Sequence, residues 1–312
     1  MRVFVTGGTG HSGSYIVPEL LTAGHEVTAL ARSDAAAAAV SAHGATVRRG
    51  DLEDLDGLKE AAAEADGVIH VAHRQDLLPS GGMAAVAAAE LPVMLAYGEA
   101  LAGSGKPLVV AGSIGSPGQL GRVVTEDDPA LPVGDEDLGT LRARNVVEAT
   151  VIGLAERGVR SSVVRIANIA HDPTDEAGFL PMLIALARQH GFAAYPGDGA
   201  NLWNAVHTRD VGSLFRLALE KAPAGRYWHA VEDEGIPLRE LAEAIGSRLG
   251  VPAVSIPLDE LMIPGHFGFL ANIVTQSYPA SNLITRQVLG WEPTLPGLLA
   301  DLDTGHYFPR ES

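Results

Sequence analysis

The sequence predicts an α/β fold in which helices cover both faces of a doubly wound parallel sheet, with a smaller C-terminal domain interleaved with it. In the first half, short runs rich in Val and Ile alternate with helical patterns. These runs are apolar throughout rather than alternating, as expected for strands buried on both faces. After Ala167 the rhythm breaks, which predicts a second, smaller unit.

Six strands and four helices follow from the pattern of the first half. The predicted strands are residues 2–6, 26–30, 45–49, 67–72, 107–112 and 161–167. Helices are expected to begin near Asp34 and Asp54, each with an acidic cap. Longer helical patterns occupy residues 84–102 and 138–157.

Loops and helices alternate in the second half. Residues 171–179 and 195–203 have loop-like compositions around a predicted helix at 180–189. Helices at 210–221 and 238–249 and a strand at 227–230 complete the pattern. We therefore expect a dinucleotide-binding domain of residues 1–167 and 204–231 and a substrate-binding domain of residues 168–203 and 232–312. Residues 261–285 lack charged side chains and form either a cavity wall or lid, or plain buried packing.

Composition excludes several classes of function. The 312 residues contain no cysteine, so disulfides, thiol catalysis and cysteine-ligated metals are ruled out. Against 38 acidic residues stand 22 Lys and Arg, a net charge of -16 that argues against nucleic acid or anionic membrane as partner. No signal peptide or metal-binding spacing is recognisable, so we expect a cytoplasmic monomer or homodimer without a metal.

A glycine-rich turn, TGGTGHSG at residues 6–13, joins the first strand to a helix. Gly7, Gly10 and Gly13 are spaced as in turns that let backbone N–H groups approach a pyrophosphate at a helix N-terminus. The strand–turn–helix context predicts a Rossmann dinucleotide site. Its candidate binding residues are Gly7, Thr9, Gly10, His11, Ser12 and Gly13.

The residue that follows the second strand favours NADP(H) over NAD(H). Arg32 lies 19 positions past Gly13, where NAD enzymes usually carry an acid for the ribose hydroxyl. A guanidinium followed by Ser33 suits a 2′-phosphate instead. Asp34 is able to bind a ribose, but a helix cap is the preferred interpretation.

Five motifs occur in the order TGGTGHSG, GDLED (50–54), VIHVAH (68–73), AVHTRDV (205–211) and LGWEP (289–293). With them the chain resembles the extended and atypical short-chain dehydrogenase/reductase superfamily, including its NAD-dependent epimerase/dehydratase-like branch. The resemblance implies that Asp51 and Leu52 lie near the adenine and that Val71, Ala72 and His73 line the cofactor cleft. It also places His207 and Asp210 at the rim between the domains, where a structural role is preferred to a catalytic one.

The superfamily's catalytic set is incomplete in this chain. That set is a Ser or Thr after the fifth strand and a Tyr-x-x-x-Lys on the next long helix. Ser113 matches the first position, whereas the register given by Glu148 implies Thr140 and Arg144 at the Tyr and Lys positions. No Tyr-x-x-x-Lys exists, because the three lysines at 59, 106 and 221 are preceded at that spacing by Leu, Ala and Leu.

Thr140 is a far poorer acid than a phenol, and Arg144 stays charged. Either another group donates the proton, or the substrate needs none from this position, or there is no redox chemistry. The candidate donors are His73, His171 and Tyr97, each with simple packing as its alternative. The predicted catalytic residues are Ser113, Thr140, Arg144 and His171, and Arg144 is also expected to hold the cofactor ribose. Tyr195, Trp203 and Trp228 are either pocket walls or core residues, with core packing preferred.

Together these observations predict an NADP(H)-dependent oxidoreductase that reduces a carbonyl or similarly polarised bond of a small apolar molecule. A non-catalytic NADP-binding sensor or scaffold is the first alternative, because the Tyr and Lys are missing. A nucleotide-sugar epimerase or dehydratase is the second, weakened by the same absence.

Overall fold

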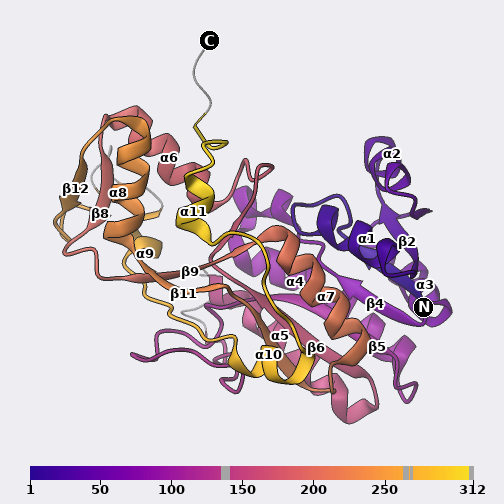
Figure 1. Ribbon diagram of the computed structural model, residues 1–312. Helices are drawn as coiled ribbons and strands as arrows, with labels where there is room; N and C mark the ends of the chain where they lie inside the picture. The colour runs from indigo at the N-terminus through magenta and orange to yellow at the C-terminus, as the bar shows by residue number, and fades with distance from the viewer. Residues whose placement is uncertain (135–140, 263–266, 268–269, 309–312) are drawn as a thin grey trace.

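A seven-stranded parallel sheet forms the centre of the protein in the computed structural model, which describes residues 1–134, 141–262, 267 and 270–308 (Figure 1). The strand order is β10-β6-β5-β4-β1-β2-β3. Its strands are β1 (Arg2–Thr6), β2 (Glu26–Ala31), β3 (Thr46–Arg49), β4 (Gly67–His70), β5 (Pro107–Ser113), β6 (Arg160–Ile166) and β10 (Arg226–Ala230). This topology confirms the predicted doubly wound fold.

Side chains of β1 show why helices cover both faces of the sheet. Val3 and Val5 join the core under α1 (Gly13–Thr22) and α7 (Thr208–Lys221), whereas Phe4 joins the core on the opposite face. Successive strand residues point to opposite faces, so an all-apolar strand requires a helix layer on each. The second layer consists of α3 (Leu55–Glu64), α4 (Leu78–Leu101) and α5 (Asn145–Gly153).

The first turns of α2 (Asp34–Ala42) and α3 test the expected caps. Asp54 caps α3 by accepting a hydrogen bond from the N–H of Gly57 at 3.0 Å, as predicted. The prediction for Asp34 is wrong, because Ser33 caps α2 by accepting from the N–H of Ala36 at 3.1 Å. Asp34 lies within the helix and pairs with Arg49 instead.

The single helix predicted for residues 138–157 is divided in the structure. A 3₁₀ turn at Leu141–Arg144 leads into α5, and a second 3₁₀ turn follows at Leu154–Arg157. Thr140 lies outside the described residues.

Two small sheets and a group of helices form the rest of the molecule, on one side of the large sheet (Figure 1). In the three-stranded sheet, β9 lies between β11 and β7, and the two-stranded sheet pairs β12 with β8. The bounds of these strands are β7 (Ile169–His171), β8 (Ala193–Pro196), β9 (Leu202–His207), β11 (Asp233–Pro237) and β12 (Ala253–Ile256). The helices are α6 (Phe179–His190), α8 (Leu238–Leu249), α9 (Ala271–Val274), α10 (Leu283–Leu289) and α11 (Leu298–Leu302).

Residues 195–203 were expected to form a loop, and that expectation is wrong at both ends, where β8 and β9 lie. The division of the chain into two domains stays a prediction.

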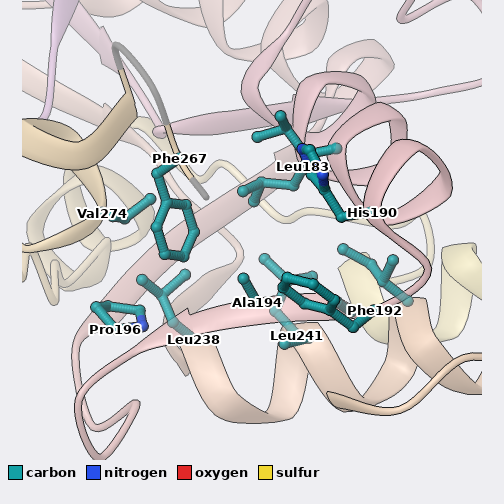
Figure 2. A pocket seen from close by; sticks show the side chains of 13 residues that line it. Leu183, His190, Phe192, Ala194, Pro196, Leu238, Leu241, Phe267 and Val274 are labelled. Carbon is teal, nitrogen blue, oxygen red and sulfur yellow. The ribbon is translucent and has the colours of Figure 1, made fainter. Parts of the chain in front are cut away.

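The described part of the uncharged segment 261–285 divides between two cores, since its buried residues up to Val274 pack inside this C-terminal unit and Ala280 joins the core of the large sheet. Phe267, Leu270 and Val274 are buried in the core of the C-terminal unit. Figure 2 shows Phe267 and Val274 facing Leu238 and Leu241 of α8 across a small apolar pocket. The cavity volume is about 20 Å³, room for one water molecule, so these residues form core packing.

One helical segment, Gly82–Leu101 of α4, is long and apolar enough to span a membrane by length and composition alone. Half of this segment is buried inside the protein, between α3 and α5. A core helix of a globular protein meets the same criterion, and this one contains a buried Glu90.

Candidate functional site

A cleft of about 1090 Å³ runs along the carboxyl ends of the parallel strands. Ligands of open α/β sheets bind at this edge, and the cleft is large enough for a dinucleotide. Segments after β1, β2, β3, β4 and β6 line it, together with residues 174–179 of the C-terminal unit. Its lining includes these predicted cofactor residues: Gly7, Thr9, Gly10, His11, Ser12, Gly13, Arg32, Asp51, Leu52, Val71, Ala72 and His73.

The glycine-rich loop is so compact that side chains are excluded at two positions. Gly7 has φ +79°, and a Cβ there would lie 2.5 Å from the backbone nitrogen of Ala72. A Cβ on Gly13 would lie 2.0 Å from the carbonyl oxygen of Gly7. Ser12, which precedes α1, makes no side-chain capping bond within the described chain. The N–H groups of Ser14 and Tyr15 donate to carbonyls of the turn. Those of residues 11–13 have no hydrogen-bond partner within the described chain, so they are available to an anion such as a pyrophosphate.

Arg32 is exposed, lines the cleft and forms no ion pair with any described residue. The acid beside it, Asp34, is engaged with Arg49. Ser33 does not line the cleft, because its hydroxyl caps α2. The guanidinium of Arg32 is thus the free charged group at the end of β2. Ser33, predicted as a second cofactor contact, caps α2 instead.

Ser113 is exposed at the end of β5 and is held by the buried Glu148 of α5. One carboxylate oxygen of Glu148 accepts the N–H of Ser113 at 2.9 Å and the hydroxyl of Ser116 at 2.5 Å. The other accepts Nε of the fully buried Arg165 at 3.2 Å. The glutamate that set the helical register therefore fixes the Ser113 turn. Ser113 itself is not among the residues lining the cleft.

Arg144 reaches the cleft indirectly, through Glu90. Nε of Arg144 donates to Glu90 Oε2 at 2.5 Å, and an Nη donates to the carbonyl of Ala111 at 3.2 Å. The other oxygen of Glu90 lies 2.9 Å from Nδ1 of His73, which lines the cleft. Burial acts to raise the pKa of Glu90, but the charge of Arg144 and the hydrogen bond from His73 outweigh it and hold the pKa at about 2.

Two of the predicted proton donors lie away from the cleft. His171, predicted to be catalytic, is fully buried, with Nδ1 2.8 Å from Asp301 and its ring edge-on to His207. Tyr97 is also fully buried, and burial raises the pKa of its phenol. Neither side chain lines the cleft, so the structure does not support either as donor. Of the three candidates, only His73 lies there.

The three aromatic residues considered as pocket walls, and His207 and Asp210 at the expected rim between the domains, pack in the core or stabilise the fold. Trp203 and Trp228 are fully buried in the cores, and Tyr195 packs against the C-terminal core, outside the cleft lining. His207 caps α7 by accepting the N–H of Arg209 at 3.2 Å. Asp210 accepts the N–H groups of Thr294 and Leu295, which lie 3.1 and 3.0 Å from its carboxylate and tie the C-terminal segment to α7.

A sequence model of the NAD dependent epimerase/dehydratase family matches residues 3–230, which include the glycine-rich loop, Ser113 and the last strand of the large sheet. The chain belongs to this family. Its resemblance to extended short-chain dehydrogenases is thereby confirmed.

Family members resemble this chain over its full length. It is 42% identical to "Uncharacterized protein C2A9.02" of Schizosaccharomyces pombe over 99% of this chain and 100% of the relative. It is 28% identical to the 4-hydroxy-2-methyl-3-oxo-4-farnesyl-3,4-dihydroquinoline-1-oxide ketoreductase of Stigmatella aurantiaca, over 95% and 88% of the two chains. A UDP-glucose 4-epimerase from Thermotoga maritima, solved with UDP-glucose, has the same fold with a TM-score of 0.73 and 21% identity, over 97% and 99% of the chains.

In this epimerase/dehydratase-family chain, the loop histidine is tied to the C-terminal unit. Nε2 of His11 lies 2.5 Å from the fully buried carboxylate of Asp172, which also accepts the N–H and hydroxyl of Thr174. Burial by itself lowers the pKa of His11, but the hydrogen bond and charge of Asp172 raise it more, so the pKa lies above its ordinary value. The two charged groups therefore stabilise each other.

We expect His11→Gln to lower the free energy of unfolding at pH 6 and to matter progressively less at alkaline pH. The folded-state pKa of His11 is raised, so its contribution is complete below the unfolded value of about 6.5 and is lost as pH rises through the folded value. Urea unfolding at pH 6 and pH 9 measures this difference, with the exposed His43→Gln as control. An equal effect of His11→Gln at both pH values would contradict it.

Sequence reasoning missed Glu90 and Asp172, which are the two buried acids that orient the cleft histidines. Glu90 is one of only two acids in the otherwise apolar α4, and an isolated acid in such a helix is rarely left buried without a partner. That was the one available signal. Asp172 lies in a loop-like run of polar residues where nothing distinguishes it.

Proposed function

We propose that this protein is an NADP(H)-dependent oxidoreductase that reduces a carbonyl or similarly polarised bond of a small, rather apolar molecule. The observation that carries the proposal is the strand-end cleft, in which a glycine cradle after β1 and a free guanidinium after β2 line one space of dinucleotide size. The likeness to a ketoreductase over most of both chains supports the reaction class. A cytoplasmic location and a small-molecule substrate belong to the same proposal.

The residues present fit a nicotinamide dinucleotide. The loop from Gly7 to Gly13 is so compact that a Cβ at either end would collide with backbone. This close packing leaves no side chain between its backbone N–H groups and a pyrophosphate. Asp51, Leu52 and Arg32 line the cleft; the first two would border the adenine, and Arg32 would bind the 2′-phosphate. When bound, the reduced nicotinamide supplies a hydride. Ser113, exposed at the end of β5 but outside the cleft lining, would orient the substrate oxygen. Arg144 would hold the ribose side of the site through its link to Glu90.

We expect Arg32→Asp to raise the KM for NADPH at least tenfold. The substitution removes the one fork of donors at the end of β2 and places a second negative charge near Asp34, so the phosphate is repelled. The KM for NADH, which lacks the phosphate, should change by less than about threefold, well under the ~1.4 kcal/mol that a tenfold change represents. An unchanged KM for NADPH would remove the basis for cofactor preference.

Anaerobic stopped-flow mixing of the protein and NADPH with a panel of ketones, aldehydes and quinones tests the reaction itself. Substrate-dependent loss of NADPH absorbance is the expected result. Tight NADPH binding without oxidation by any compound would instead support a non-catalytic sensor or scaffold. That second candidate is favoured by one observation, the absence of Tyr-x-x-x-Lys from the whole sequence.

A further inference from the structure

A buried carboxylate links the cleft to the position of the missing lysine. Glu90, in the middle of the largely apolar helix α4, is fully buried. An unpaired charge at such depth is strongly unfavourable, yet both oxygens of Glu90 are used, one by Arg144 at 2.5 Å and the other by His73 at 2.9 Å. The two partners come from segments far apart in sequence, after β4 and before α5.

The ionised state of Glu90 fixes the orientation of the His73 ring. An ionised carboxylate only accepts hydrogen bonds, so Nδ1 of His73 must carry the hydrogen that it shares with Glu90. Nε2, the other ring nitrogen, has no partner within the described chain, and the side chain is 27% exposed where it lines the cleft. The ring is thus held at one nitrogen and free at the other.

The neighbouring histidine of the same strand end does not have this freedom. His70 is fully buried, with Nδ1 2.8 Å from the hydroxyl of Thr6. Burial, assisted by the charges of Arg144 and His73, lowers the pKa of His70 to about 4 against the opposing charge of Glu90, so the ring is neutral. Because His70 is neutral, the described charged groups near His73 are Glu90, Arg144 and Arg74. Arg74 forms ion pairs with the exposed side chains of Glu53 and Asp76.

We propose that His73 is the catalytic acid that replaces the missing tyrosine and that Glu90 is its positioning residue. This inference rests on the proposed reductase function and specifies the group that completes it. Glu90 holds the ring by Nδ1 and compensates the positive charge of the imidazolium, while Arg144 keeps Glu90 ionised. The pattern is that of a histidine oriented by a buried acid.

The reaction requires a hydride and a proton. The hydride comes from a reduced nicotinamide, which is oxidised, and the proton comes from His73, so the carbonyl is reduced to an alcohol. As the substrate's carbonyl carbon receives the hydride, the C=O π pair moves to the oxygen. The N–H bond at Nε2 of His73 breaks, and its proton forms the new O–H bond of the alcohol. The electron pair of the broken bond stays on Nε2, so the ring becomes neutral and then takes a proton from water in the open cleft.

His73→Gln tests the acid. We expect kcat for carbonyl reduction to fall between about 100-fold and 10,000-fold, the range typical for loss of a general acid. The Kd for NADPH, measured by fluorescence without substrate, should rise by less than tenfold, because His73 also lines the proposed cofactor cleft. His43→Gln, an exposed histidine at the end of α2, serves as matched control and should retain the kcat of the unmodified protein.

Two further readouts separate a positioning role of Glu90 from a structural one. In ¹⁵N–¹H spectra of the histidine rings, Nδ1 of His73 should carry a slowly exchanging hydrogen in the unmodified protein and lose this protection in Glu90→Gln. The same variant should lower kcat at least tenfold with KM nearly unchanged. An Nδ1 without hydrogen in the unmodified protein would overturn the assignment of Glu90.

The outcomes distinguish a failure of the His73 assignment from a failure of the proposed reductase function. If the unmodified protein reduces a carbonyl and His73→Gln does so within threefold of its rate, the inference is wrong and the reductase function stands. If none of the compounds in the panel causes the unmodified protein to oxidise NADPH, the proposed function and the inference fail together.

Discussion

Replacing Gly13 by alanine is expected to lower the affinity for NADPH at least 100-fold. The new Cβ would lie 2.0 Å from the carbonyl oxygen of Gly7, a contact that only backbone movement relieves. Such movement displaces the first turn of α1 and the N–H groups that face a pyrophosphate. A 100-fold loss corresponds to about 2.8 kcal/mol of binding free energy. Fluorescence titration with NADPH measures it, and circular dichroism reports whether the fold is retained.

Two glycine variants serve as graded controls for that result. At Gly10 the added Cβ would lie 3.3 Å from the same carbonyl oxygen, so Gly10→Ala should weaken binding by less than tenfold. At Gly153, near the end of α5, no atom lies within 4 Å, and Gly153→Ala should bind NADPH normally. Equal affinities for Gly13→Ala and Gly153→Ala would show that the loop does not contact the dinucleotide.

Replacing Arg165 by methionine is expected to lower the free energy of unfolding by about 3–5 kcal/mol, the usual cost of removing one partner of a buried ion pair. Arg165 is fully buried, donates to Glu148 and to the carbonyl of Asp128, and stacks 3.6 Å over the ring of Tyr227. Methionine fills much of the volume but leaves the carboxylate of Glu148 without its cation. Chemical denaturation monitored by tryptophan fluorescence gives the value.

The double variant Arg165→Met with Glu148→Gln provides the control. If the uncompensated charge is the main cause, removing it should recover about half of the loss, because a neutral amide still bonds the Ser113 N–H and Ser116. Losses that simply add would assign the effect to packing against Tyr227 instead.

The large sheet was predictable because its strands carry a local signal. Val- and Ile-rich runs buried on both faces, separated by helices with recognisable first turns, specify a parallel sheet from neighbouring residues alone. The strands β8 and β9 were not predictable, since Pro196, Gly197 and Gly199 dominate the run and pairing with distant β12 and β11 decides its structure. Asp34 was mistaken for a cap because Ser33, one position earlier, satisfies the same rule.

The cofactor end of the site was predictable for the same reason. Gly7 to Gly13 and Arg32 each follow a strand directly, and strand ends meet along one edge of a parallel sheet, whereas Asp51 was expected there from the family resemblance. The catalytic end depends on contacts between distant segments. His73 and His171 both follow strands and are equivalent in the sequence, but one pairs with Glu90 on the cleft and the other with Asp301 in the interior. Only tertiary packing separates them.

The placement of β10 at the outer edge of the large sheet has a consequence for synthesis on the ribosome. β6 ends at Ile166, but its outer neighbour begins only at Arg226, after α6, α7 and three strands of the small sheets have been made. Until then the outer edge of β6 presents unpaired backbone groups, a template for pairing with other nascent chains. The pairing of β10 with β6, in which Trp228 lies opposite Val164, is therefore the step that satisfies these groups of β6.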